Sequence, residues 1–174
     1  PQRAVMFSGT VESNVAYGEK DGTQYTLDDV KEAVRIAQGQ EFIEQKDDTY
    51  SAHVAQGGTN FSGGQKQRLA IARAVCRKPE IYIFDDSFSA LDYKTDRLLR
   101  TALKEETGEA TSLIVAQRIG TIRDADLIVV LDEGNVVGQG THDELMKSCD
   151  VYKEIAYSQL SKEELENSMG GDRA

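Results

Sequence analysis

The chain has 174 residues, of which 39% are hydrophobic and 29% charged, and its formal net charge is −10. These values suit a soluble globular domain or one lobe of a larger domain, and the acidic balance argues against nucleic acid as the main partner. No stretch approaches the roughly 18 consecutive apolar residues of a membrane span, and no signal peptide opens the chain. Two cysteines far apart in sequence argue against a disulfide framework and favour a reducing, cytoplasmic setting.

The N-terminal third is predicted to be mainly helical. Residues 2–18 lack a clean period, and we expect a loop with short extended or helical pieces. Thr26 caps a predicted helix over 27–38, whose first turns carry three acidic residues near the positive end of the helix. A second short helix is predicted at "EFIEQK" (41–46), and the glycine-rich loop "QGGTNFSGG" (56–64) follows it.

The clearest local signal begins at Ser62. The segment from Ser62 to Gln65 fits a capping box, and apolar residues continue a helical pattern to about Arg77 before Pro79 ends it. The apolar run "IYIF" (81–84) then predicts a strand. Because this run is continuous rather than alternating, we expect a strand that is buried on both faces of a parallel sheet.

The remaining chain alternates strands and helices. The predicted elements are a helix over 92–106, a strand over 111–116, a short helix over 118–124, a strand over 127–131, a hairpin strand over 135–139, and a helix opened by the capping box of Thr141 and Glu144. This order predicts an α/β fold with a mostly parallel sheet and flanking helices. From about Ser161 the chain is polar and acidic, and we expect it to fray.

A basic island interrupts the acidic chain over residues 62–79. This segment contains no acidic residue, and its basic residues are Lys66, Arg68, Arg73, Arg77 and Lys78. Such an island is consistent with phosphate binding and equally with the solvated face of an amphipathic helix. At the start of the predicted helix, two glycines allow close backbone approach, and free N–H groups attract anions, so a phosphate fits there. An ordinary helix start is the alternative interpretation.

Taken together, the motifs resemble those of the ABC ATPase family. "FSGGQ" (61–65) is similar to the family's signature motif, "IYIFDD" (81–86) to its Walker B strand, "SALD" (89–92) to its D-loop, "PQ" (1–2) to its Q-loop, and "VAQRIGTI" (115–122) to its switch loop. The resemblance implies a P-loop NTPase-like fold with an α-helical subdomain. It divides the chain into a Q-loop segment (1–10), the helical subdomain with the signature (11–78), the C-terminal part of the RecA-like core (79–160) and a flexible tail (161–174).

The family's architecture implies roles for individual residues. Two nucleotide-binding domains face each other head to tail and clamp two ATP molecules, so ATP and Mg²⁺ are the implied cofactors. The implied partners are a second nucleotide-binding domain and the transmembrane domain of the same chain, with no nucleic acid. The implied site residues are Ser62, Gly63, Gly64, Gln65 and Asp92 for contact with ATP on the partner, Asp85 and Gln2 for the metal, and Asp86, Gln117 and Gln2 for hydrolysis.

The family's phosphate-binding loop, Walker A, is absent because the chain contains no Gly-Lys pair. The family places this loop upstream of the Q-loop, and the chain starts at Pro1 without a methionine. We therefore interpret the sequence as the C-terminal part of a nucleotide-binding domain. By itself, this part is expected to bind ATP poorly and to lack ATPase activity. The resemblance also implies a place on the cytoplasmic face of a bacterial cell membrane.

Two departures from the family pattern concern hydrolysis. Asp86 stands where the family has a glutamate that polarises the attacking water, and it is one methylene shorter, or roughly 1.5 Å. Gln117 stands where the switch loop has a histidine, and an amide cannot carry a proton. Asp86 and Gln117 together resemble the pattern of the degenerate-site subunit of heterodimeric ABC exporters. We therefore expect an impaired hydrolytic site in this chain and an intact signature motif that serves its partner.

Three functions fit this sequence. The first is the ATP-driven engine of a membrane exporter, which "VMFSGTVESNVAYG" (5–18) and "GTHDEL" (140–145) favour. The second is a soluble ABC ATPase that acts on nucleic acid or the ribosome. The third is a regulatory nucleotide clamp, which differs from the first only in whether this site hydrolyses ATP. The exported substrate does not follow from these residues.

Overall fold

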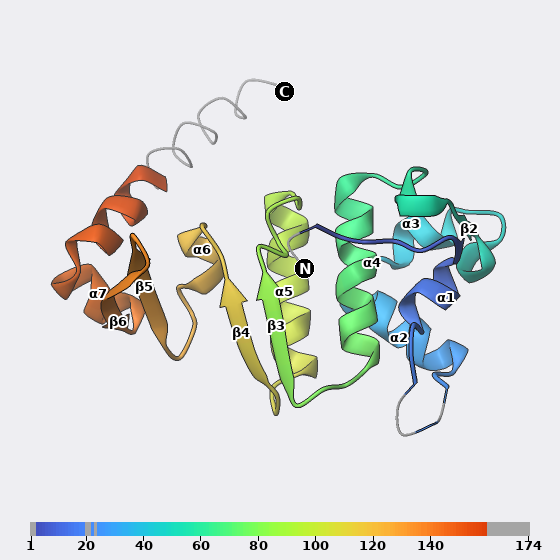
Figure 1. The fold of residues 1–174 in the computed structure, drawn as a ribbon, viewed down its shortest axis with the longest axis horizontal. Coiled ribbons are helices and arrows are strands. Elements are labelled where there is room, and N and C mark those ends of the chain that lie inside the picture. Colours follow the sequence, from blue (N-terminus) through green and yellow to red (C-terminus); the bar gives the residue numbers. More distant parts are fainter. Residues whose placement is uncertain (1–2, 20–21, 23, 160–174) are drawn as a thin grey trace. The chain divides into compact units, whose positions relative to one another are not determined.

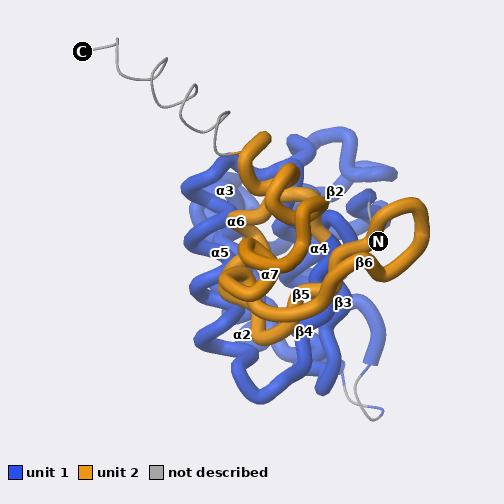
Figure 2. Tube along the Cα trace, turned by 90° about the vertical axis from the view of Figure 1, so that its left-hand side faces the viewer, with its two compact units in different colours: residues 1–115 blue, residues 116–174 orange. Residues whose placement is uncertain are grey.

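The computed structural model describes residues 3–19, 22 and 24–159. The chain divides into two compact units, residues 1–115 and residues 116–174 (Figure 2). Each unit has its own hydrophobic core and is described separately below. Within the described ranges, no helix combines the length and the apolar character that crossing a membrane requires.

The first unit begins with a group of helices (Figure 1). These are α1 (Val11–Val15), α2 (Leu27–Ile36), α3 (Gln40–Glu44) and α4 (Gly63–Cys76), accompanied by the short antiparallel strands β1 (Gly9–Thr10) and β2 (His53–Val54). The prediction of a helix after Thr26 is confirmed, since the Thr26 side chain accepts a hydrogen bond from the backbone N–H of Asp29. The predicted capping box at Ser62 is confirmed as well.

Helix α4 is the centre of this helical part, because it packs against both α1 and α2. Its apolar residues recur with helical spacing and point to one side, where Leu69, Ala72 and Val75 are buried. Val30 and Val34 on α2 are also fully buried. This core therefore holds the beginning of α4 in a defined place relative to the rest of the unit.

A parallel pair of strands completes the first unit. Strand β3 (Ile81–Asp85) pairs in parallel with β4 (Thr111–Val115), from Ile81 opposite Thr111 to Asp85 opposite Val115. Helix α5 (Tyr93–Glu106) connects the two strands. The β-α-β order that the sequence predicts is confirmed here, and with it the α/β class.

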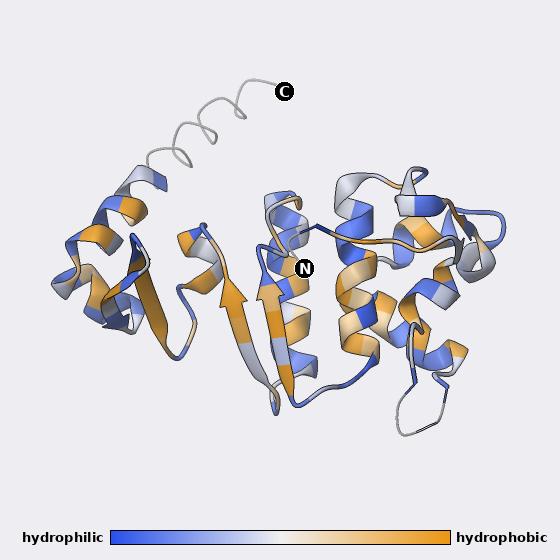
Figure 3. Cartoon of the chain, in the orientation of Figure 1, coloured by the Kyte–Doolittle hydropathy of each residue, from blue (hydrophilic) through white to orange (hydrophobic). Residues whose placement is uncertain are grey.

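The expectation that β3 is buried on both faces is wrong for this chain. Tyr82 and Phe84 point into the core, whereas Ile81 and Ile83 are 62% and 67% exposed. Both β3 and β4 consist largely of hydrophobic residues, as the hydropathy colouring shows (Figure 3). The burial alternates because helices cover one face of this two-stranded pair, while among the described residues nothing covers the other.

The second unit is a hairpin packed against helices. It comprises α6 (Ile119–Ile122), β5 (Ile128–Asp132), β6 (Asn135–Gly140), α7 (His142–Ser148) and a further helical segment over 150–159. Strands β5 and β6 are antiparallel, as the predicted hairpin requires. The capping box of Thr141 and Glu144 at the start of α7 is confirmed. The tail predicted to fray from about Ser161 lies outside the described residues.

Candidate functional site

The first part of the candidate site is the exposed beginning of α4. The Gln65 backbone N–H donates to Ser62 Oγ at 3.2 Å, and the Ser62 N–H donates to Gln65 Oε1 at 3.0 Å. In the first turn of a helix the backbone N–H groups have no acceptor within the helix. A Cβ placed on Gly63 would meet no atom within 4 Å, so this turn is open to an anion from outside.

Gly64 brings this turn against a second loop. A Cβ on Gly64 would lie 3.2 Å from the Ala90 carbonyl oxygen and 3.7 Å from Leu91 Cδ2. The S-G-G-Q turn and the S-A-L-D loop, which are distant in sequence, are therefore in direct contact within the first unit. This close approach explains a glycine at position 64, because a side chain there would press on the carbonyl group.

The two aspartates after β3 have different environments. Asp85 is the last residue of the strand and lies on the same exposed side as Ile81 and Ile83. Asp86 is only half-buried, and its φ of 48° places it in the left-handed region. Its backbone N–H still donates to the Val115 carbonyl oxygen at 3.0 Å, which extends the ladder between the parallel strands by one hydrogen bond. The turn therefore begins at Asp86.

Asp92 caps helix α5, a role that the family resemblance does not include. Its Oδ1 atom accepts a hydrogen bond from the Thr95 backbone N–H at 2.9 Å, and this bond lowers the pKa of Asp92. The carboxylate is nevertheless exposed. It can cap α5 and still present its exposed side to a second molecule.

Two predicted site residues, Gln117 and Gln2, fall outside the described part of the first unit. Gln117 belongs to the second unit, where its side chain is exposed and its carbonyl oxygen accepts a hydrogen bond from Gln159 Nε2 at 2.5 Å. Gln2 lies outside the described residues. The structure thus brings together the signature turn, the two aspartates after β3 and Asp92, all within the first unit.

A polar network centred on Asn14 and Arg73 attaches the segment that precedes α1 to helix α4. Sequence reasoning did not predict this network. Asn14 is 1% exposed; its Oδ1 accepts from the Phe7 N–H at 2.9 Å and from Arg73 Nη2 at 3.0 Å. Arg73 also donates to the carbonyl oxygens of Asn14 at 2.6 Å and Val5 at 2.9 Å. Its guanidinium group lies 5.2 Å from the ring centroid of Phe7, which stacks on Tyr17. An Asn and an Arg 59 positions apart give no local sequence signal of this contact.

The basic island therefore divides into internal and external charges. Arg73 holds backbone carbonyl groups, and Arg68 Nη1 donates to the Gln38 carbonyl oxygen at 2.7 Å. Lys78 forms an exposed ion pair with Asp29 at 3.4 Å. Neither phosphate binding nor a simple solvated face describes Arg68 and Arg73, because both act as donors within the fold.

Replacing Asn14 by alanine is expected to destabilise the protein by about 1–3 kcal/mol, since partly buried backbone groups of Phe7 and the guanidinium group of Arg73 lose the hydrogen bonds that the buried Asn14 side chain makes. Urea unfolding of the two forms, compared by their midpoints at unchanged slope, measures this loss. The matched control is Asn135→Ala, because the exposed Asn135 makes a hydrogen bond of 3.3 Å to Glu133 at the hairpin. Equal, small losses for both variants would contradict a structural role of the network.

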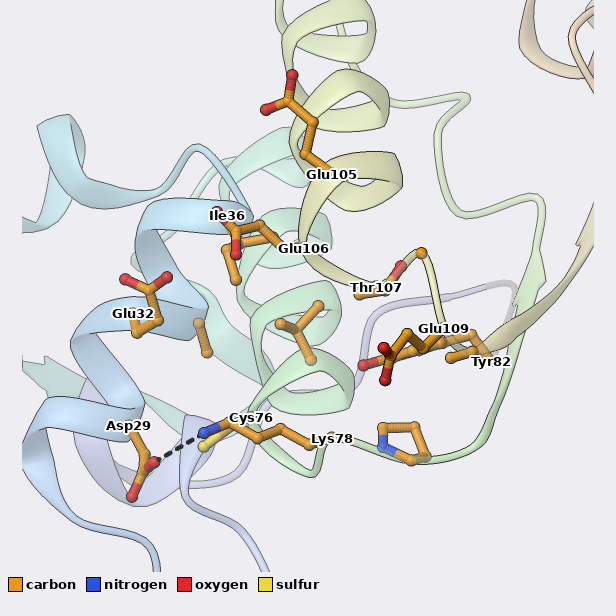
Figure 4. A pocket seen from close by; sticks show the side chains of 15 residues that line it. Asp29, Glu32, Ile36, Cys76, Lys78, Tyr82, Glu105, Glu106, Thr107 and Glu109 are labelled. Atoms are coloured by element: carbon orange, nitrogen blue, oxygen red, sulfur yellow. Dashed lines mark hydrogen bonds and ion pairs between the residues drawn. The ribbon is translucent and has the colours of Figure 1, made fainter.

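A cavity of about 600 Å³ lies elsewhere in the first unit (Figure 4). It is lined by the ends of α2, α4 and α5 and by the start of β3, with Cys76, Lys78 and Tyr82 among its walls. Burial raises the pKa of the Cys76 thiol to about 11, so it is a neutral core group. No predicted site residue lines this cavity, and it takes no part in the site at the other end of β3.

Comparisons with known proteins agree with the motifs. The ABC transporter family model matches residues 1–89. An uncharacterised ABC transporter ATP-binding protein of Mycobacterium bovis is 48% identical over 91% of this chain and 27% of its own length. A Rickettsia felis protein named as an export ATP-binding/permease protein is 40% identical over 92% of this chain and 27% of its own.

The structural comparison gives the same result. The solved structure of a bacterial Atm1-family ABC exporter with ATP bound matches with a TM-score of 0.85 and 35% identity, over 92% of this chain and 28% of that one. The chain thus spans about a quarter of the length of the relatives it matches, 27% for each of the two named here.

Proposed function

Because the chain belongs to the ABC transporter family, we propose that it forms part of the nucleotide-binding domain of an exporter, in which ATP binding and hydrolysis drive transport. The observation that carries this proposal is the contact between the S-G-G-Q turn and the S-A-L-D loop at Gly64. One exposed edge of the first unit thereby presents both motifs together. Residues 11–78 then act as the helical subdomain, and residues 79–160 as the second part of the ATPase core.

The proposed partner of this edge is the nucleotide held by a second nucleotide-binding domain. The open first turn of α4, where backbone N–H groups have no acceptor within the helix, suits the γ-phosphate of that ATP. The exposed carboxylate of Asp92 is available to the phosphate loop of the same partner. This chain's own ATP would need a phosphate loop from another part of the longer protein, since no Gly-Lys pair occurs here.

The residues after β3 fit a magnesium ion held chiefly by phosphate and water. Mg²⁺ prefers oxygen ligands, keeps several waters and usually takes one or two carboxylates. Asp85 offers one exposed carboxylate, and no group of three or more acidic, histidine or cysteine side chains converges among the described residues. When bound, the ion would neutralise charge on the β- and γ-phosphates. Asp85, with Gln2, would hold it in place.

We further propose that this chain's own site hydrolyses ATP poorly. Asp86 begins a turn and is shorter than the glutamate of the family pattern, and Gln117 cannot carry the positive charge of a histidine. Asp86 would hold the attacking water imperfectly, whereas the signature turn would complete the partner's site without impairment. The assembly is then a heterodimer of two different nucleotide-binding domains. Its transmembrane part would come from the remaining length of chains such as those of the relatives, and this domain would then lie at the cytoplasmic face of a membrane.

Co-expression of the whole protein with candidate partner subunits tests this function. ATPase activity in membranes should appear with one partner and remain low when the protein is expressed alone, because only a different subunit supplies a complete site. Full activity of the protein alone would contradict the heterodimer. Activity that requires nucleic acid or ribosomes instead of membranes would contradict the exporter.

A further inference from the structure

The side chain of Ser89 contacts the carboxylate of Asp86. Ser89 Oγ lies 3.0 Å from Asp86 Oδ2 and 3.1 Å from the Asp86 carbonyl oxygen, and it donates toward both. A hydroxyl group has a single proton, so both acceptors share it. The proposed catalytic carboxylate is therefore already engaged by a residue of its own turn.

The core fixes the position of Ser89 on both sides. Phe88 is buried, and its ring centroid lies 5.4 Å from that of Phe84 on β3. Leu91 is buried as well, and its N–H donates to the Phe88 carbonyl oxygen at 3.1 Å. The carbonyl group of Ala90 rests against Gly64. Because residues 88, 90 and 91 are all held, the hydroxyl group at position 89 has a defined place.

The backbone at Asp86 is equally defined. Its N–H group is bound to Val115, and its φ of 48° turns the chain away from the line of the strand. An aspartate has only two side-chain torsions, so a carboxylate bound to Ser89 points along the turn. A general base must reach within about 2.6–3.2 Å of the proton it accepts. Asp86 is short, and in this orientation one of its oxygens is directed at Ser89 instead of at a water.

We infer that Ser89 is a positioning residue that restrains Asp86 in the resting turn. This inference rests on the proposed function, in which Asp86 occupies the position of the base. It adds a positioning residue to that function, because the hydrogen bond from Ser89 holds one carboxylate oxygen of Asp86 within the turn.

The test measures hydrolysis at this chain's own site in the assembled transporter, with the partner chain's own phosphate loop inactivated so that the other site contributes nothing. Steady-state phosphate release over a range of ATP concentrations is compared for the wild type, Ser89→Ala, Ser89→Thr, Asp86→Asn and the double variant of Ser89→Ala with Asp86→Asn. Ser89→Ala is expected to raise kcat about 3- to 10-fold with unchanged KM for ATP. Ser89→Thr, which keeps the hydroxyl group, should match the wild type, and Ser89→Ala should have no effect when Asp86 is Asn.

The outcomes separate this inference from the proposed function. A rate that Asp86→Asn leaves unchanged would contradict the role of Asp86 itself, and with it the proposed site. A rate that Asp86→Asn abolishes but Ser89→Ala fails to raise would contradict only the restraint. A rise that persists in the double variant would show that Ser89 acts on the loop rather than on Asp86, which also contradicts the restraint.

Discussion

Replacing Gly63 by aspartate is expected to lower ATP hydrolysis by the assembled transporter at least about 100-fold, the size of loss seen when one donor to a developing oxyanion is removed. The new carboxylate would stand at the first turn of α4, where the proposed γ-phosphate of the partner's ATP binds, and would repel it. The fold should persist, because the space around Gly63 is open and an acidic residue suits the start of a helix. Steady-state ATPase measurements on purified transporter give the rate.

The matched control is Gly63→Asn, which adds a side chain of nearly the same shape without the charge. It should retain much more activity than Gly63→Asp, while both variants unfold at the same urea concentration as the wild type. A Gly63→Asp transporter with normal turnover would show that this turn does not meet a phosphate. Equal losses in the two variants would point to steric exclusion in place of charge.

The combined change of Asp86→Glu and Gln117→His is expected to raise hydrolysis at this chain's own site by about 10- to 100-fold, in line with what correct placement of a reacting group contributes. The glutamate restores the missing reach of roughly 1.5 Å, and the histidine restores a group that can carry a proton. Each single change should do little, because the water and the phosphate must both be held. The measurement is single-turnover phosphate release with the partner's own site inactivated.

Asp86→Gln combined with Gln117→His serves as the control, since glutamine has the length of glutamate without its charge. This pair should not exceed the wild-type rate, because it lacks the carboxylate at position 86. A single Asp86→Glu variant that gains the whole increase would show that Gln117 does not limit the site. The two gains are compared as a double-mutant cycle.

Local signals made most helices predictable. Thr26, Ser62, Asp92 and Thr141 each cap a helix in the structure, and the helices that follow them begin within a residue or two of the predicted positions. Caps and periodic apolar residues act over a few positions, so they can be recognised without tertiary information. Helix α1 was not predicted as a separate element, because five residues are too few for a period. Much of its support comes from contacts of Asn14 with Arg73.

The burial of β3, unlike the helix starts, could not be predicted from local sequence. Its apolar residues are the same whether one face or two are covered, and the coverage depends on which other segments pack against the strand. The sequence predicts a buried strand on average but not that Ile81 and Ile83 are exposed in this chain. Pattern alone therefore identifies the element and leaves its surroundings undetermined.

The candidate site divides in the same way. Its motifs could be recognised from residue order, because S-G-G-Q, D-D and S-A-L-D are contiguous. The contact of Gly64 with Ala90 and the hydrogen bond from Ser89 to Asp86 depend on how two loops meet and on the unusual φ of Asp86. These features require the folded backbone, and the expected restraint on Asp86 follows from them alone.

The most direct test of the asymmetric site is to find which chain holds nucleotide after hydrolysis. Vanadate traps ADP only at sites that have hydrolysed ATP, and a photoreactive adenine then labels the chain that carries that nucleotide. The account predicts that the label in the wild-type transporter is confined almost entirely to the partner chain, whose site this chain's signature turn completes. Equal labelling of the two chains would contradict an impaired site formed by Asp86 and Gln117.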